Sequence, residues 1–139
     1  MIKRIAHVAV ATNSISKTIE FYRQLGLNVE HEEIVSDQKV RVAIIPIGDS
    51  SLELIEPVAP DSPISKFLDG SRGGIHHVSL EVEDLETRLD ELKAARIRLI
   101  DEKPRIGGEG KQIAFIHPAS TGGVLIELTE AVKKTKGKT

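Results

Sequence analysis

Cysteine is absent from the 139-residue sequence, and aromatic residues make up only 3% of it. Without cysteine the chain has no disulfide, no thiolate metal ligand and no thiol nucleophile, so any metal ion must be bound by His, Asp or Glu. The shortage of aromatic rings leaves few surfaces for stacking the bases of single-stranded nucleic acid. These two absences exclude thiol chemistry and argue against a nucleic-acid platform.

The sequence also lacks a large excess of one charge. Lys and Arg number 19 against 21 Asp and Glu, which gives a net charge of −2. Four lysines lie among the last seven residues, so residues 1–129 carry 15 − 20 = −5. A negative body disfavours binding to nucleic acid, and no nucleic-acid partner is expected.

Long hydrophobic runs are missing as well, since none approaches the roughly 20 residues that a membrane helix needs. A strand-like pattern starts at Ile2 with no signal or transit peptide before it, so we expect a cytoplasmic protein without a membrane partner. Apolar residues at 40% and charged residues at 29% are typical of a globular chain. The length fits one domain.

An internal repeat is the strongest feature that is present. The segment His7-Val8-Ala9-Val10 corresponds to His77-Val78-Ser79-Leu80 at an offset of 70, and Glu53-Leu54-Ile55-Glu56 corresponds to Glu127-Leu128-Thr129-Glu130 at an offset of 74. The offset between equivalent residues grows from 70 to 74 across turn-rich stretches, where insertions are tolerated. The repeat therefore predicts two similar modules, each with a His on its first strand and a Glu on its last.

Each half has the pattern strand, helix, strand, strand, strand, which predicts an α+β fold of two tandem βαβββ modules. We expect module 1 over residues 2–57, a linker with a short helix over 58–72, module 2 over 73–130 and a mobile basic tail over 131–139. Within the modules we expect strands at 3–10, 28–36, 39–47 and 51–57, then at 74–82, 98–102, 112–117 and 123–130, with helices at 14–25 and 85–95. Arg96 stands where the first helix has Gly26, so the second helix must end differently or bear a small strain.

Strand alternation places the polar residues of the repeat away from the helices. Val8 and Val10, with Ala6, are expected to pack under a helix, whereas His7 faces the other side. The same alternation puts His77, Glu53 and Glu127 opposite the helix layer, and His76 on it. Burying an unpaired carboxylate costs several kcal/mol, and a bound cation removes that cost.

Two imidazoles and two carboxylates suit a divalent metal ion, and the lack of thiolates argues against a closed structural zinc site. We therefore predict a metal centre that leaves positions open for a ligand. Co²⁺ and Mn²⁺ are the first candidates, and Ni²⁺, Zn²⁺ and Mg²⁺ also fit. The predicted ligands are His7, Glu53, His77 and Glu127.

With these residues in place, the sequence resembles the vicinal oxygen chelate superfamily of glyoxalases, bleomycin resistance proteins and dioxygenases, and within it the methylmalonyl-CoA epimerase family. The resemblance covers nearly the whole chain. It rests on these segments: Ile5-Ala6-His7-Val8-Ala9-Val10, Leu52-Glu53-Leu54-Ile55-Glu56-Pro57, Asp61-Ser62-Pro63-Ile64, Gly74-Ile75-His76-His77-Val78, Asp101-Glu102-Lys103-Pro104-Arg105-Ile106-Gly107 and Gly122-Gly123-Val124-Leu125-Ile126-Glu127-Leu128.

The resemblance implies an open, cupped, barrel-like sheet with the helices outside. It also implies an isomerase that interconverts (2R)- and (2S)-methylmalonyl-CoA by metal-assisted proton abstraction through an enolate. Glu127 is the first acid/base and a metal ligand in this reading. An acyl-CoA substrate and a homodimer are the implied partners.

Inversion at carbon requires a second acid/base on the opposite face of the substrate. Some relatives place a Glu on the strand equivalent to residues 40–47, but here that strand offers only Arg41, which stays protonated. Glu53 or an ordered water is the remaining candidate. For substrate binding we expect Lys111, in a Gly-rich loop, to attract the coenzyme A arm, and four residues near the last strand to contact the substrate carboxylate: Ser120, Thr121, Gly122 and Gly123.

Two other functions fit the same residues. A glyoxalase I-like lyase uses the same metal constellation to move a proton on a glutathione hemithioacetal. A non-catalytic protein of the same fold binds a small molecule in the barrel, although such proteins generally lack the full ligand set. The motifs outside the four ligands favour the epimerase.

Overall fold

The computed structural model describes residues 1–131, and the basic tail predicted at 131–139 lies outside these residues apart from Ala131. Its strands are β1 (Ile2–Ala11), β2 (His31–Val35), β3 (Val40–Ile47), β4 (Ser50–Pro57), β5 (Gly74–Val82), β6 (Arg105–Ile106), β7 (Gln112–Ile116) and β8 (Ile126–Glu130). Its α-helices are α1 (Ile15–Gln24), α2 (Pro63–Leu68) and α3 (Leu85–Ala94). The predicted α+β class is confirmed, and α2 occupies the predicted linker helix.

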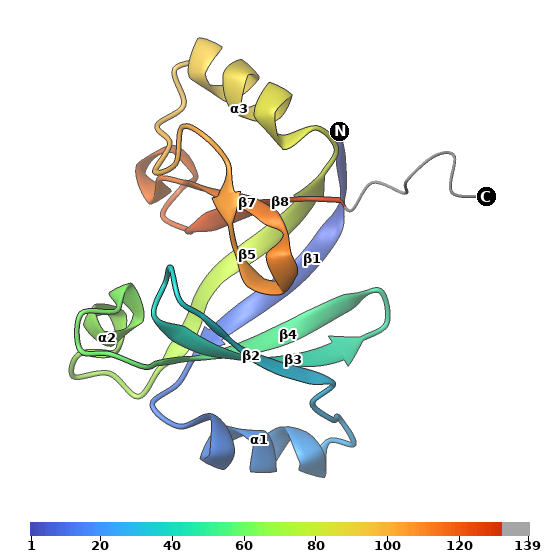
Figure 1. The fold of residues 1–139 in the computed structure, drawn as a ribbon, viewed down its shortest axis with the longest axis vertical. Helices are drawn as coiled ribbons and strands as arrows, with labels where there is room; N and C mark the ends of the chain where they lie inside the picture. The colour runs from blue at the N-terminus through green and yellow to red at the C-terminus, as the bar shows by residue number, and fades with distance from the viewer. Residues whose placement is uncertain (132–139) are drawn as a thin grey trace.

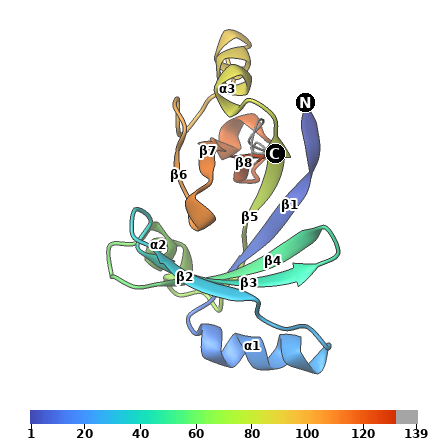
Figure 2. The ribbon, with the colours of Figure 1, turned by 45° about the vertical axis from the view of Figure 1, so that its right-hand side comes forward.

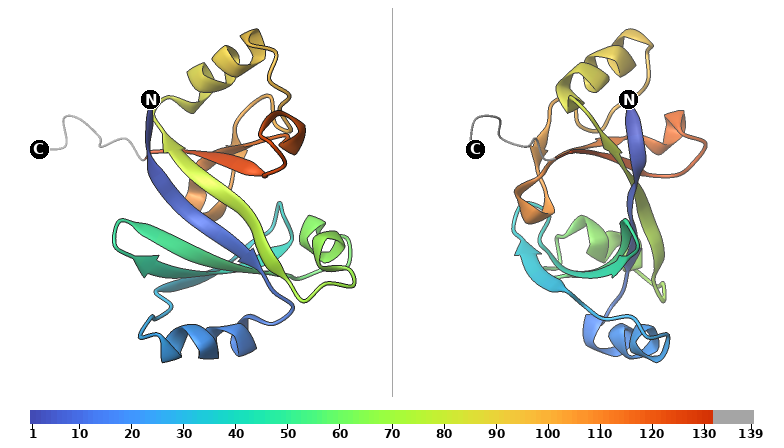
Figure 3. Two further views of the ribbon diagram at one scale, coloured as in Figure 1. Left: turned by 180° about the vertical axis from the view of Figure 1, so that it is seen from behind. Right: turned by 90° about the vertical axis from the view of Figure 1, so that its right-hand side faces the viewer.

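All eight strands of the described residues form one curved sheet in the order β2-β3-β4-β1-β5-β8-β7-β6 (Figure 1). The two first strands of the modules, β1 and β5, pair antiparallel at its centre, and each pairs in parallel with the last strand of its own module. Seen from behind, β1 and β5 cross the middle of the molecule (Figure 3). The two halves are therefore related by an approximate twofold axis at the β1–β5 contact.

Helices α1 and α3 lie outside the sheet at opposite ends of the molecule (Figure 2). Under α1 the buried residues are Ile15, Ile19, Ala43, Ile45 and Leu54. Under α3 they are Val82, Leu85, Leu89, Ala114, Ile116 and Leu128. A third cluster lines the concave side of module 1, where Ile64 and Leu68 of α2 close it. The concave face therefore carries apolar residues on the module 1 side, beside the polar residues at its centre.

The first N–H group of each long helix, α1 and α3, is bound by a glutamate from the last strand of the same module. The Ile15 N–H donates to Glu56 Oε1 at 2.7 Å, and the Leu85 N–H donates to Glu130 Oε1 at 3.1 Å. A carboxylate at this place accepts a hydrogen bond from an N–H group that has no partner in the helix, and its negative charge interacts favourably with the positive end of the helix dipole. The pairing of Glu56 with Glu130 in the repeat thus reflects one structural role used twice.

Two local predictions are wrong. Residues 98–102 do not form a strand but make one isolated bridge, between Leu99 and Ile116, and the two-residue strand β6 follows later. The carboxylate of Asp101 accepts the Phe115 N–H at 2.8 Å in place of a backbone carbonyl. Ala6 does not pack under a helix but lines the concave cavity, because it is an extra residue between the pairs Ile5–Leu80 and His7–Ser79. A β-bulge of this kind breaks the alternation of faces.

The end of α3 bears a small backbone strain at Arg96, which is one of the two outcomes predicted for this position. Arg96 takes the left-handed conformation with φ 63°, as Gly26 does with φ 87° after α1. The Arg96 N–H bonds the Lys93 carbonyl and the Ile97 N–H bonds the Leu92 carbonyl, and α1 has the equivalent pair of bonds. The helix therefore keeps the same cap and bears the strain at a non-glycine residue. Within residues 1–131, no helix is both long and apolar enough to cross a membrane.

Candidate metal centre

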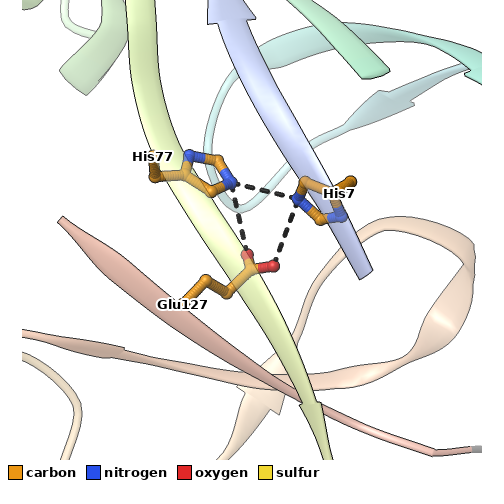
Figure 4. A group of neighbouring side chains, drawn as sticks. All are labelled: His7, His77 and Glu127. Carbon is orange, nitrogen blue, oxygen red and sulfur yellow. Dashed lines mark hydrogen bonds and ion pairs between the residues drawn. The ribbon is translucent and has the colours of Figure 1, made fainter. Parts of the chain in front are cut away.

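Three side chains from three strands meet on the concave face of the sheet (Figure 4). The Nε2 atoms of His7 and His77 are 3.2 Å apart, and Glu127 lies with Oε1 3.4 Å from Nε2 of His7 and Oε2 3.8 Å from Nε2 of His77. One ligand atom from each residue falls within 4.8 Å of the others. Two nitrogens and one carboxylate therefore face a common point.

The central strand pairing explains why these residues meet. His7 pairs with Ser79 and His77 pairs with Ala9 across the β1–β5 contact. Glu127 lies beside Ser79 on the next strand. The approximate twofold axis thus brings together two histidines that are 70 positions apart in the sequence.

Glu53 contacts the other side of the His7 ring. Its Oε2 is 2.9 Å from His7 Nδ1, and Glu53 occupies the position beside Ala9 that matches Glu127 beside Ser79. The imidazole of His7 therefore lies between two carboxylates, one at each ring nitrogen. With the side chains as they lie, Glu53 orients His7, while the cluster of facing ligand atoms consists of His7, His77 and Glu127.

Burial and charge act in opposite directions on these groups. Burial lowers the pKa of His7, but the Glu53 hydrogen bond and the charges of Glu53 and Glu127 outweigh it, so the pKa lies above its usual value. Burial lowers the pKa of His77 well below its usual value, and the neighbouring His7 and His76 add to the effect. Burial raises the pKa of Glu127 although His7 opposes the rise.

The donor set fits a divalent metal ion. Oε1 of Glu127 is buried and accepts no hydrogen bond from any of residues 1–131. A buried carboxylate oxygen without a donor is costly, and a dication bound there removes the cost. Neutral imidazole and carboxylate are also the ligand types that such ions take in sites without thiolate.

The cluster opens into a cavity of about 250 Å³ inside the cup. His7, Glu53, His77 and Glu127 line it together with Lys111 and Arg4, and apolar residues of β3 form much of the wall. Lys111, which is predicted to attract the coenzyme A arm, is one of the residues that line this cavity. Lys111 also lies 3.8 Å from Glu109 in the same loop.

The four predicted carboxylate-binding residues near the last strand lie elsewhere. Ser120, Thr121, Gly122 and Gly123 belong to the turn between β7 and β8 and are not among the residues that line the cavity. The hydroxyl of Ser120 accepts the Arg98 N–H at 2.9 Å, and that of Thr121 donates to backbone carbonyls of its own turn. Their contacts in the structure hold the turn.

Sequence reasoning missed two residues at the site. Arg4 lines the cavity and pairs with Glu81 at 3.1 Å, although alternation gave no sign of it because the bulges in β1 shift the register. His76, placed by alternation on the helix side, has its Nδ1 2.9 Å from Nδ1 of His77. The adjacent histidines in the sequence were the only signal for this contact.

Comparison with known proteins identifies the family. The model of the Glyoxalase/Bleomycin resistance protein/Dioxygenase superfamily matches residues 6–115. Over 128 residues the chain is 44% identical to uncharacterized protein YqjC of Bacillus subtilis, covering 91% of each. Over 133 residues it is 38% identical to the ethylmalonyl-CoA/methylmalonyl-CoA epimerase of Cereibacter sphaeroides, covering 94% of this chain and 99% of that protein.

A solved structure agrees with this result. A variant of Streptomyces coelicolor methylmalonyl-CoA epimerase in complex with 2-nitronate-propionyl-CoA matches with a TM-score of 0.91 and 33% identity, covering 97% of this chain and 100% of that one. The curved sheet and the outer helices are thus shared, which confirms the predicted cup. The chain belongs to the glyoxalase/bleomycin resistance protein/dioxygenase superfamily and, within it, to the family of the methylmalonyl-CoA epimerases.

Proposed function

We propose that this protein is a methylmalonyl-CoA epimerase, an isomerase that interconverts (2R)- and (2S)-methylmalonyl-CoA. The observation that carries the proposal is the convergence of His7, His77 and Glu127 on one cavity. It occurs in a chain related over nearly its full length to a named epimerase. The relative bound to an acyl-CoA analogue supports an acyl-CoA as the substrate class.

The chemistry requires removal of a weakly acidic proton from the carbon between a thioester and a carboxylate. Glu127 is the base in this proposal, because its carboxylate lines the cavity and its buried Oε1 has no hydrogen-bond donor within residues 1–131. His7, His77 and Glu127, joined by Glu53, would hold a divalent ion, and the ion would supply positive charge to stabilise the developing enolate. Apolar residues of β3 line the cavity beside these groups.

Glu53 is the proposed second acid/base. It lines the same cavity and lies on the opposite ring nitrogen of His7 from Glu127. A two-base inversion needs acid/base groups on opposite faces of the reacting carbon, and Glu53 is the other carboxylate that lines the cavity beside His7. Service of Glu53 as the fourth metal ligand requires its carboxylate to leave Nδ1 of His7.

Substrate binding follows from the charges at the cavity. Lys111 places a cation at the cavity for the anionic coenzyme A arm. In the Gly-rich loop before it, the N–H groups of Gly107 and Glu109 are used in hydrogen bonds within the protein. Contacts from Ser120, Thr121, Gly122 and Gly123 to the substrate carboxylate stay predictions. So do a homodimer, a cytoplasmic location and Co²⁺ or Mn²⁺ as the native ion.

The test is proton NMR of one methylmalonyl-CoA epimer in D₂O with metal-loaded protein and with protein treated with a chelator. We expect metal-dependent deuterium uptake at C2 and appearance of the other epimer. Exchange is expected to disappear in Glu127→Gln, while acyl-CoA affinity falls less. Turnover of the glutathione hemithioacetal without any exchange of methylmalonyl-CoA would assign the site to a glyoxalase I-like lyase instead.

A further inference from the structure

His76 and His77 are neighbours on β5, yet their rings touch. Successive residues of a regular strand point to opposite faces. Here the pairs Ala9–His77 and Val10–Ile75 leave His76 as an extra residue in β5. The bulge turns His76 so that its Nδ1 lies 2.9 Å from Nδ1 of His77, with the two rings at 81°.

The bulge is a feature of both modules. In β1 one of the extra residues is Ala6, which comes directly before His7. In β5 the extra residue is His76, which comes directly before His77. Each histidine of the metal centre therefore follows a bulged residue, and the two differ in what holds Nδ1: Glu53 for His7, and the His76 ring for His77.

Aromatic contacts fix the position of the His76 ring. Phe67 of α2 lies edge-to-face against His76 with the ring centroids 4.9 Å apart. His77 in turn lies edge-to-face against Phe115 of β7 at 5.3 Å. Phe67, His76, His77 and Phe115 therefore form one row of edge-to-face ring contacts from the linker helix to β7.

Two ring nitrogens 2.9 Å apart share one proton, because two lone pairs or two N–H groups facing each other repel. The Nε2 atom of His77 faces His7 and Glu127. If Nε2 offers its lone pair to a metal ion, the neutral ring carries its proton on Nδ1. The His76 Nδ1 is then the acceptor, and the proton of His76 sits on its own Nε2.

We propose that His76 is a positioning residue that fixes the Nδ1–H tautomer of His77 and so presents the His77 Nε2 lone pair to the metal. This inference rests on the metal centre of the proposed function, but not on the identity of the substrate. Ligating histidines usually donate their second N–H to a carboxylate, carbonyl or water, and loss of that partner weakens metal binding about 10- to 100-fold. Here a second imidazole takes the partner's place.

The first measurement uses the unaltered protein loaded with Zn²⁺, which is diamagnetic. Long-range ¹H–¹⁵N spectra of its histidine rings are expected to place the His77 proton on Nδ1 and the His76 proton on Nε2. A proton on Nδ1 of His76, or a His76 ring that carries both protons, overturns the proposal. No variant is needed, so a folding defect cannot affect the result.

The second measurement is Zn²⁺ affinity by competition with a chelator. His76→Phe keeps a flat ring but removes the acceptor, and we expect affinity to fall about 10- to 100-fold. His76→Asn offers an amide oxygen near the place of Nδ1 and is expected to restore affinity to within about threefold of the parent. His117→Phe makes the same change at a histidine of the β7–β8 turn and is expected to leave Zn²⁺ affinity unchanged.

The outcomes separate this inference from the proposed function. Equal Zn²⁺ affinity of His76→Phe and the parent protein overturns the role of His76, even if the parent epimerises methylmalonyl-CoA. Loss of affinity in both His76→Phe and His76→Asn also overturns it, because a simple packing role predicts that result. Absence of epimerisation, with the expected tautomers and affinities, overturns the substrate and leaves the role of His76 standing.

Discussion

At the scale of single residues, Glu127 combines reactivity with a cost in stability. Burial raises the pKa of its carboxyl above the usual value of 4.5. A raised carboxyl pKa favours the folded state below pH 4.5, and that contribution is lost as pH rises through the folded-state pKa. At pH 7 the ionised side chain therefore destabilises the metal-free protein.

We expect Glu127→Gln to raise the melting temperature of metal-free protein at pH 7, because the amide removes the buried charge. At pH 4 the difference from the parent should become small, since the carboxyl is then largely protonated in both folded and unfolded chains. The measurement is calorimetry at the two pH values in the presence of a chelator. Glu83→Gln changes an exposed carboxylate and serves as the control; an equal or lower melting temperature for Glu127→Gln at pH 7 contradicts the expectation.

Some residues of the metal centre and its cavity could be predicted from the sequence, and others could not, because the latter depend on how the strands pair. His7, His77 and Glu127 follow from the repeat, because duplicated strands around a twofold axis bring equivalent positions together. Arg4 and the His76–His77 contact do not, because both depend on β-bulges. A bulge depends on how two strands pair, so the alternation of residues along one strand does not predict it.

At the scale of helices and strands, the two capping glutamates connect each helix to the last strand of its module. Glu56 and Glu130 each accept an N–H group at a helix start. Replacing either by Ala is expected to cost about 1 kcal/mol of unfolding free energy. Urea denaturation measures this cost.

The caps lie in different modules and share no hydrogen-bond partner, so the two costs should add in the double variant. Glu83→Ala, at an exposed glutamate before α3, is the matched control and should change stability little. A double variant no less stable than either single variant would contradict independent caps.

The end of α3 offers a gain in stability. Arg96 is exposed and holds the left-handed φ of 63° that glycine adopts at lower cost. Arg96→Gly relieves this strain but adds freedom to the unfolded chain, so the expected net gain is about 0.5–1 kcal/mol. Ala95→Gly is the control, because Ala95 has φ −84° and needs no glycine; unfolding in urea should show a gain for the first variant and a loss for the second.

The wrong prediction at residues 98–102 also belongs to this scale. The first module has a five-residue strand β2 at the equivalent place, so the repeat favoured a strand here. In the second module the Asp101 side chain bonds the Phe115 N–H, and Pro104 follows without an N–H to give. Side-chain bonds that replace a ladder bond are not visible in hydrophobic periodicity.

At the scale of the whole molecule, contacts at the rim of the cup join the two modules. The Glu109 N–H donates to Glu33 Oε1 at 2.6 Å, and Arg105 pairs with Asp37 at 3.1 Å. The first contact links β2 to the loop that carries Lys111, and the second links Asp37, which follows β2, to β6 directly before that loop. The ion pair is exposed, so its contribution to stability is small; the contacts mainly fix where the Lys111 loop stands above the cavity.

A bound metal ion would add a further connection between the modules, because His7 comes from one and His77 and Glu127 come from the other. An ion that binds only when both modules are in place stabilises the whole fold, by about 4 kcal/mol at 1,000 times its dissociation constant. We expect Co²⁺ or Mn²⁺ to raise the melting temperature, and a chelator to reverse the rise. Calorimetry of parent protein and His7→Ala over a metal titration measures the effect.

The decisive comparison is between ligands of the two modules. His7→Ala and His77→Ala should each lose most of the metal-induced rise, although they alter different halves of the chain, because each removes a ligand from the same ion. His31→Ala, at an exposed histidine outside the cluster, should keep it. If His77→Ala loses the rise while His7→Ala retains it in full, the ion is held by module 2 alone and the cross-module centre is wrong.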